Sequence, residues 1–154
     1  MRGPTMAASA EGCIFCKIVR REAPASIVRE DAFTLAFMDI QPMNTGHVLV
    51  IPKAHAEYVE DLPAGSAGPI LEAAKEVSRA LRASGIRCEA VSFYLANGKE
   101  AGQEVFHTHM HVIPRWRGDG LGFRVRRDRD RVADRTELDT LAAKIRAAMG
   151  RSGS

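Results

Sequence analysis

Hydrophobic residues recur with helical spacing in three segments of the chain. The clearest segment is 69–83, which Ser84-Gly85 closes. Its apolar positions fall on one helical face and are Ile70, Leu71, Ala74, Val77 and Leu81. A shorter helix is expected over 13–20, from the spacing of Ile14, Phe15, Ile18 and Val19. A C-terminal helix is expected from Leu138, Leu141, Ala142 and Ile145.

Runs of β-branched and aromatic residues predict extended segments between these helices. The first four cover 25–29, 32–39, 47–51 and 90–96, and Pro52 ends the third. The fifth, 105–114, is predicted to be a buried strand. Because the elements follow each other without a regular β-α-β alternation, we expect an α+β domain with an antiparallel sheet.

Three of the five histidines lie in that last strand, in the run His107-Thr108-His109-Met110-His111. In an extended chain alternate side chains share a face, so the three imidazoles are predicted to stand in a row. A single strand histidine is usually a hydrogen-bonded core residue. Burying three would leave several polar atoms to satisfy, and imidazole can act as nucleophile, acid, base or metal ligand near neutral pH. The row therefore predicts a functional site.

The chain has 154 residues and 45% hydrophobic content, which suits one globular domain. No run reaches the roughly 18 to 20 apolar residues of a membrane span, and the N-terminus lacks a signal-peptide pattern. Three cysteines are too few, and odd in number, for a disulfide framework. We expect a cytoplasmic protein with a disordered leader over 1–10, a main domain over 11–114 and an Arg-rich segment with the final helix over 115–154.

The net charge of +3 is concentrated in one segment. Residues 115–135 contain eight arginines and four aspartates, whereas the rest of the chain has 14 basic and 15 acidic residues. Such a segment can attract a phosphate-rich ligand or RNA. Because its arginines and aspartates are interspersed, a solvent-exposed segment is favoured instead, and we do not expect a nucleic-acid partner.

Cys13 and Cys16 form a C-x-x-C pair, which can be a redox pair, half of a metal site or two packed residues. The redox version usually follows a buried strand, and nothing strand-like precedes Cys13. We therefore favour half of a tetrahedral zinc site, which needs two further ligands. His55 and His107 are the candidates.

The histidine row itself allows two kinds of chemistry. It can supply metal ligands, but barrel hydrolases that open with His-x-His need about 250 residues, and no acidic ligand follows the row. It can also supply a nucleophile that attacks phosphorus. The loop before the row, with Asn97-Gly98 and Ala101-Gly102-Gln103, can direct N–H groups at phosphate oxygens or can be an ordinary hairpin connection.

Several segments together resemble one family, the histidine triad or HIT proteins, whose signature is H-x-H-x-H followed by apolar residues. Here the signature is His107-Thr108-His109-Met110-His111-Val112-Ile113. The resemblance covers most of the chain and looks like the bacterial branch close to the nucleoside phosphoramidases. It extends to Cys13-Ile14-Phe15-Cys16-Lys17-Ile18, Ala36-Phe37-Met38-Asp39-Ile40, Gly46-His47-Val48-Leu49-Val50-Ile51-Pro52-Lys53-Ala54-His55, Asn97-Gly98 and Ala101-Gly102-Gln103-Glu104-Val105-Phe106.

The resemblance implies catalytic roles for three histidines. His109 would attack the α-phosphorus of a nucleotide and carry the nucleotidyl group until water releases it. His111 would assist departure of the leaving group, and His47 would orient and polarise the triad.

The resemblance also implies a nucleotide site. Asp39 would bind the ribose hydroxyls, and the base would lie against Phe15, Phe37, Ile40 and Leu49. The phosphate would be contacted by Asn97, Gln103 and the backbone near Val105.

The zinc ligands implied by the resemblance are Cys13, Cys16, His55 and His107, with one structural zinc per chain. The implied fold is HIT-like, an antiparallel sheet with a central helix and a C-terminal helix, joined across a homodimer through 90–96 and 69–83.

The implied substrates are purine nucleotides such as AMP or an AMP conjugate, above all AMP linked to an amine. The alternatives are a diadenosine polyphosphate hydrolase or phosphorylase, and a nucleotide-binding scaffold with vestigial activity.

Two features depart from the eukaryotic phosphoramidases. Glu104 stands where those proteins have serine, and a carboxylate near a phosphate repels it by about a kcal/mol or more at short range. The Arg-rich segment and final helix replace a short tryptophan-proline tail, so we expect leaving-group specificity to lie partly there.

Overall fold

The computed structural model describes residues 10–122 and 132–149, which divide into two units, one ending at Leu121 and one beginning at Gly122. Most of the predicted leader and the centre of the Arg-rich segment, 123–131, lie outside the described residues. Each unit is described by itself below.

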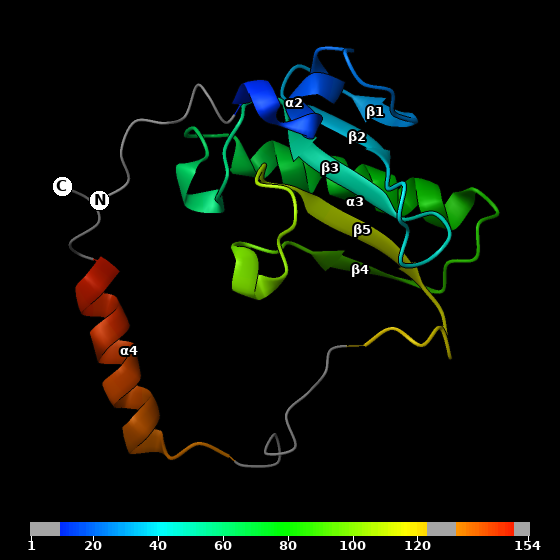
Figure 1. The fold of residues 1–154 in the computed structure, drawn as a ribbon. Helices are drawn as coiled ribbons and strands as arrows, with labels where there is room; N and C mark the ends of the chain where they lie inside the picture. Colours follow the sequence, from blue (N-terminus) through cyan, green and yellow to red (C-terminus); the bar gives the residue numbers. More distant parts are fainter. Residues whose placement is uncertain (1–9, 123–131, 150–154) are drawn as a thin grey trace. The chain divides into compact units, whose positions relative to one another are not determined.

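The first unit is built on a five-stranded antiparallel sheet with the strand order β1-β2-β3-β5-β4 (Figure 1). β1 to β3 form an antiparallel meander, and β5 pairs with both β3 and β4. This architecture confirms the prediction of an α+β fold with an antiparallel sheet. The strands are β1 (Ile27–Glu30), β2 (Thr34–Met38), β3 (Val48–Pro52), β4 (Ala90–Tyr94) and β5 (Met110–Arg115).

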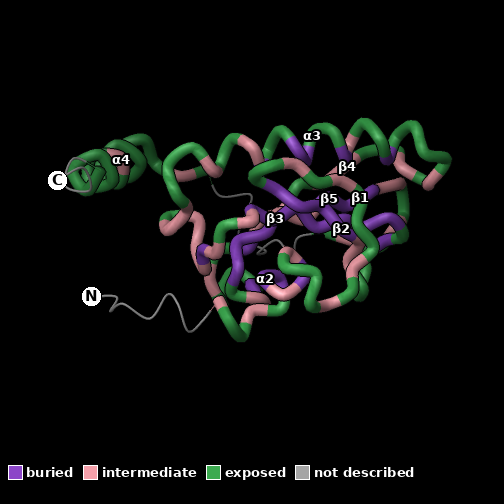
Figure 2. The backbone as a smooth tube through the Cα atoms, turned by 90° about the horizontal axis from the view of Figure 1, so that it is seen from above, coloured by how far each residue is buried: buried purple, intermediate pink, exposed green. Residues whose placement is uncertain are grey.

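Helices cover both faces of this sheet (Figure 2). α3 (Ala67–Ala83) packs on one face, where Ala36, Val50 and Val112 meet its apolar side. α2 (Ile14–Val19) packs on the other face, against Leu35, Phe37, Leu49 and Ile51. Because alternate residues of a strand point to opposite faces, β2 and β3 are buried on both sides and consist almost entirely of apolar residues.

The predicted strand over 105–114 is wrong for its first five residues, because β5 begins only at Met110 and contains only the last histidine of the triad. The N–H and the hydroxyl of Thr108 both donate to the Ala56 carbonyl, at 2.7 and 3.0 Å, and the N–H of His107 donates to the Val105 carbonyl at 2.9 Å. These bonds replace a strand ladder. The segment from Val105 to His109 is therefore a loop, and the histidines are placed by it rather than by strand alternation alone.

The second unit contains α4 (Arg135–Met149), which confirms the predicted C-terminal helix. The Asp134 carboxylate caps its N-terminus by accepting the N–H groups of Thr136 and Glu137 at 3.0 and 3.3 Å. Among the described residues, no helix combines the length and the apolar character needed to cross a membrane.

Candidate functional site

Four predicted zinc ligands converge between α2 and the loop before β5. Cys13 and Cys16 lie at the start of α2, His55 follows β3, and His107 lies in the triad loop. The Nδ1 atom of His107 lies 3.5 Å from each of the two sulfur atoms and 3.3 Å from Nδ1 of His55, which is itself 3.2 Å from Sγ of Cys16. The ligand atoms of all four residues lie within 4.8 Å of one another.

The tautomer of His107 suits a metal. Its Nε2–H donates to the Pro52 carbonyl at 2.8 Å, so in the neutral ring the lone pair of Nδ1 faces the sulfur atoms. Tetrahedral zinc with bonds of about 2.3 Å to sulfur and about 2.05 Å to nitrogen separates sulfur from nitrogen by about 3.5 Å and two nitrogens by about 3.3 Å. Burial and the neighbouring Cys13 raise the pKa of the Cys16 thiol to about 11, and a bound cation would reverse that effect. The four residues therefore fit zinc.

The hydrogen bonds of His109 leave one of its ring nitrogens available. Its Nδ1–H donates to the carbonyl of His107 at 2.7 Å, which leaves the lone pair of Nε2 available. The residue is buried, and its ring meets Phe15 edge to face, with centroids 5.2 Å apart. Burial lowers the pKa of His109, and the carboxylates of Asp39 and Glu104 act in the opposite direction. A lowered pKa keeps the ring neutral, the form that can attack phosphorus.

Hydrogen bonds running in one direction link His47 to His111. The N–H of Met43 donates to Nδ1 of His47 at 3.1 Å, so the proton of this ring is on Nε2. That Nε2–H lies 2.9 Å from Nδ1 of His111 and donates to it, which leaves His111 with its proton on Nε2. Burial lowers the pKa of His47, and burial with the charges of His109 and His47 lowers the pKa of His111 to about 4.

Asp39 lies beside this pair, with Oδ2 3.6 Å from Nε2 of His47. The ligand atoms of Asp39, His47 and His111 are also close enough to hold a metal ion. However, Nε2 of His47 is a hydrogen-bond donor, because Met43 occupies the other nitrogen. The hydrogen bonds therefore favour a metal at the cysteine cluster and proton transfer at this one.

The residues expected around the base are not all brought together. Phe15, Phe37 and Leu49 pack in one buried cluster on the α2 face, and the rings of Phe15 and Phe37 meet at 5.4 Å. Ile40 is 93% exposed in the turn after β2. Three of the four thus share a buried cluster in which Phe15 contacts His109, and Ile40 is not part of that cluster.

The side chains expected around the phosphate bond to their own loop and to the segment 57–60. The Asn97 amide accepts the N–H of Val59 at 2.9 Å and donates to Glu60 at 2.8 Å. Gln103 accepts the N–H of Gly98 at 2.8 Å and donates to the carbonyls of Glu57 and Val105, at 2.8 and 3.1 Å. These amides hold the loop in shape.

Sequence reasoning missed a polar network next to the His47 turn. Asn44 is buried and donates to the Pro114 carbonyl at 2.8 Å and to the Asp119 carboxylate at 3.0 Å. Arg115 binds the same carboxylate through two hydrogen bonds, and this partner holds the pKa of Asp119 well below its usual range. The network joins the turn that carries His47 to the end of β5. Its only signals in the sequence are the turn residue Asn44 and the distant pair Pro114-Arg115, and neither predicts their contact.

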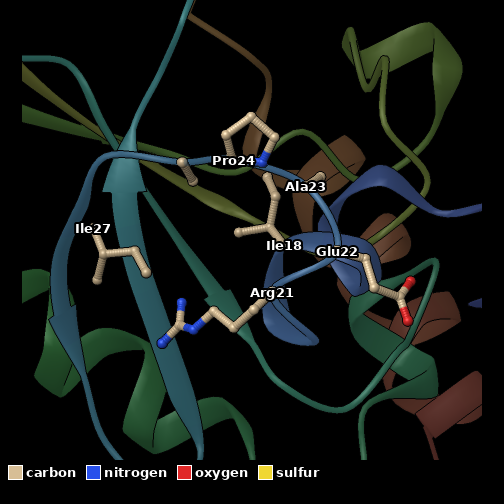
Figure 3. Close-up of a pocket in the computed structure, with 7 residues that line it drawn as sticks. Ile18, Arg21, Glu22, Ala23, Pro24 and Ile27 are labelled. Carbon is tan, nitrogen blue, oxygen red and sulfur yellow. The ribbon is translucent and has the colours of Figure 1, made fainter.

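One hollow in the described surface, of about 310 Å³, borders the candidate site and is lined by Gly12, Cys13, Ile14, Glu57, Glu104, Val105 and Phe106, whereas another lies away from it. A pocket of about 400 Å³ lies between the end of α2 and β1, lined by Ile18, Arg21, Glu22, Ala23, Pro24, Ala25 and Ile27 (Figure 3). Its two charged side chains are already paired, Arg21 with Glu30 and Glu22 with Arg20. None of the predicted site residues lines it, so it is not the candidate site.

Comparison with known proteins matches residues 20–118 to the HIT domain. An uncharacterized HIT-like protein of Borreliella burgdorferi is 47% identical over 113 residues, covering 73% of this chain and 81% of the relative. An adenosine 5'-monophosphoramidase of Schizosaccharomyces pombe is 43% identical over 103 residues, covering 67% of this chain and 74% of the relative. A zinc-bound histidine triad family protein from Mycobacterium smegmatis has a TM-score of 0.70 and 37% identity, over 90% of this chain and 99% of that one.

Proposed function

The chain belongs to the HIT family, and from this premise we propose that it hydrolyses or transfers the nucleotidyl group of purine nucleotides at the α-phosphate. AMP linked to an amine is the preferred substrate class, in line with the name of the Schizosaccharomyces pombe relative. The observation that carries the proposal is the bond from Nδ1–H of His109 to the His107 carbonyl, because it leaves Nε2 as a neutral nucleophile.

In the first step, Nε2 of His109 bonds to the α-phosphorus while the bond from phosphorus to the amine nitrogen breaks. The leaving nitrogen takes the proton from Nε2 of His111 and departs as the free amine. Transfer of this proton leaves His111 as an imidazolate, and the positive charge that His109 gains on phosphorylation balances its negative charge, because the two ring centroids lie 4.9 Å apart.

In the second step, water attacks the same phosphorus and the bond to Nε2 of His109 breaks. One water proton returns to His111, and AMP is released. His47 keeps Nδ1 of His111 occupied throughout, so the proton transfers take place at Nε2.

Asp39 binds the ribose hydroxyls in this proposal, and the base lies against the cluster of Phe15, Phe37 and Leu49, with Ile40 at its open side. Asn97 and Gln103 act on the phosphate by fixing the loop 97–105, since their amides bond within the chain. Zinc at Cys13, Cys16, His55 and His107 supplies a structural link between α2 and the triad loop.

The protein is further proposed to be a cytoplasmic homodimer. β4 is an edge strand of the sheet, and its Phe93 is 46% exposed. An open edge with an exposed aromatic side chain is suited to pairing with a second copy.

The proposal is tested by incubating the protein with an AMP conjugate of a primary amine labelled in the phosphate. We expect turnover and a trapped nucleotidyl adduct with the wild type, and neither with His109→Ala. The melting temperature of the variant checks that it is folded. Equal turnover by His109→Ala would overturn the proposal.

Two other outcomes identify the alternatives. Tight AMP binding without adduct or turnover by the wild type indicates a nucleotide-binding scaffold. A higher kcat/KM on diadenosine tetraphosphate than on the AMP-amine conjugate indicates a diadenosine polyphosphate hydrolase.

A further inference from the structure

Tyr94 lies directly across the sheet from His111. The two residues are register partners in the antiparallel pair of β4 and β5, so their side chains stand on the same face. Val91 and Val112 of the same strands pack on the α3 side, which places Tyr94 and His111 on the opposite side, that of the triad. The ring centroids are 5.4 Å apart and the ring planes are tilted by 36°.

The hydroxyl of Tyr94 reaches the loop that precedes the triad. It donates to the carbonyl of Ala101, in the 3₁₀ turn Lys99–Ala101. Gly102 follows with φ of +94°, and a Cβ atom there would lie 3.2 Å from the Tyr94 hydroxyl oxygen. The backbone of this loop is therefore fitted closely around the phenol group.

His111 is enclosed by three rings. The centroid of His47 lies 5.1 Å away and that of His109 4.9 Å away, and Tyr94 completes the set. His47 fixes the Nδ1 end of the His111 ring by a hydrogen bond. The tyrosine ring packs against the His111 imidazole, so tilting this ring away from His47 would require Tyr94 to move.

We propose that Tyr94 is a positioning residue for departure of the leaving group, which holds the His111 ring so that its Nε2–H faces the leaving nitrogen and which ties the 99–102 turn to that ring. The inference rests on the proposed function. Its two contacts come from different parts of one side chain, the ring on His111 and the hydroxyl on Ala101. The hydroxyl contact can therefore be removed while the ring contact is kept.

The kinetic test compares two substrates with Tyr94→Leu, which removes both contacts. One is an AMP conjugate of a primary amine, whose nitrogen needs a proton to leave. The other is the p-nitrophenyl ester of AMP, whose phenolate leaves without one. General acid catalysis is worth about 10²- to 10⁴-fold, so we expect a loss of about tenfold or more in kcat/KM for the amine and about threefold or less for the ester.

Tyr94→Phe keeps the ring and removes only the hydroxyl bond. We expect kcat for the amine conjugate to stay near the wild-type value and KM to rise, because the loop 97–103 loses one anchor. Phe93→Leu is the matched control, since it removes an aromatic ring from the same strand on the opposite face. In this control, any general effect of a weakened β4 should lower kcat/KM equally for both substrates.

An equal loss on both substrates in Tyr94→Leu, or no loss on either, would overturn the proposal. A second readout does not depend on activity. Imidazole nitrogen shifts in the NMR spectrum report the tautomer of His111, which we expect to be Nε2–H in the wild type and Tyr94→Phe and mixed in Tyr94→Leu. Unchanged His111 shifts in Tyr94→Leu would reject the positioning role. A wild type that turns over neither substrate would reject the proposed function alone.

Discussion

His107 and His109 stand two residues apart and differ in which ring nitrogen carries the proton. His107 donates from Nε2 to Pro52 and turns Nδ1 to the cysteines, whereas His109 donates from Nδ1 to the His107 carbonyl and keeps Nε2 free. His47 differs again, because the Met43 N–H occupies its Nδ1. One backbone partner per ring thus fixes a different tautomer in chemically identical side chains, which suits His107 to a metal, the proposed nucleophile His109 to attack through Nε2, and His47 to donate a hydrogen bond.

Replacing His111 with glutamine should make the stability of the protein depend less on pH below about pH 6.5. Burial, together with His109 and His47, lowers the pKa of His111 to about 4, whereas an unfolded histidine titrates near about 6.5. As the pH falls the unfolded state takes up the proton first, so the stability linked to His111 is complete above about pH 6.5 and is lost toward about pH 4.

The measurement is thermal melting of both proteins in the same buffers across that interval. The wild-type melting temperature should fall more steeply with decreasing pH than that of His111→Gln. Loss of zinc acts on both proteins alike, so the difference between the curves isolates His111. Parallel curves would contradict the assignment.

Secondary-structure elements with their own periodicity were predictable, and those set by distant backbone partners were not. The spacing of Ile70, Val77 and Leu81 predicts the helix observed as α3. The late start of β5 depends on Ala56, which is 52 residues from Thr108 and leaves no local pattern. The pairing of Tyr94 with His111 needs the register of two strands, which hydrophobic alternation alone does not specify. The family resemblance predicted which residues cluster around His107 and which histidines form the triad, but not their hydrogen bonds.

Zinc should hold α2 against the triad loop. Cys13→Ser and His55→Ala are each expected to reduce bound zinc well below one per chain and to lower the melting temperature, because structural zinc contributes directly to folding free energy. Cys88→Ser is the matched control, since its thiol bonds to the Ala90 carbonyl outside the cluster. Metal analysis that finds undiminished zinc in both ligand variants would remove the assignment.

Asn44 should stabilise the turn that carries His47. Asn44→Ala removes two hydrogen bonds at a buried position, so we expect the free energy of unfolding to fall by about 1 to 3 kcal/mol. Urea unfolding measures this change. Gln41→Ala, at an exposed position of the same turn, should stay within about 0.5 kcal/mol of the wild type. Equal effects of the two substitutions would assign no special role to Asn44.

At the scale of the sheet, helices cover both faces, and β1 and β4 are the two edge strands. α3 and α2 cover the faces, so the strands in the middle are buried. β4 has a neighbour only on the β5 side, and β4 carries Tyr94, which contacts the triad. A second copy paired at this edge would therefore lie one strand away from His111, which connects assembly to the candidate site.

We expect the wild type to sediment as a dimer of twice the 16.8 kDa chain mass. Phe93→Lys should shift it toward the monomer, because a charged side chain on an edge strand opposes pairing with another strand. Phe33→Lys is the control, since Phe33 is 65% exposed in the turn between β1 and β2. A monomeric wild type at micromolar concentration, or equal dissociation of the two variants, would place the interface elsewhere or exclude it. If the dimer also supports the site, Phe93→Lys should lose activity in proportion to its monomer fraction, and raising the protein concentration should restore both together.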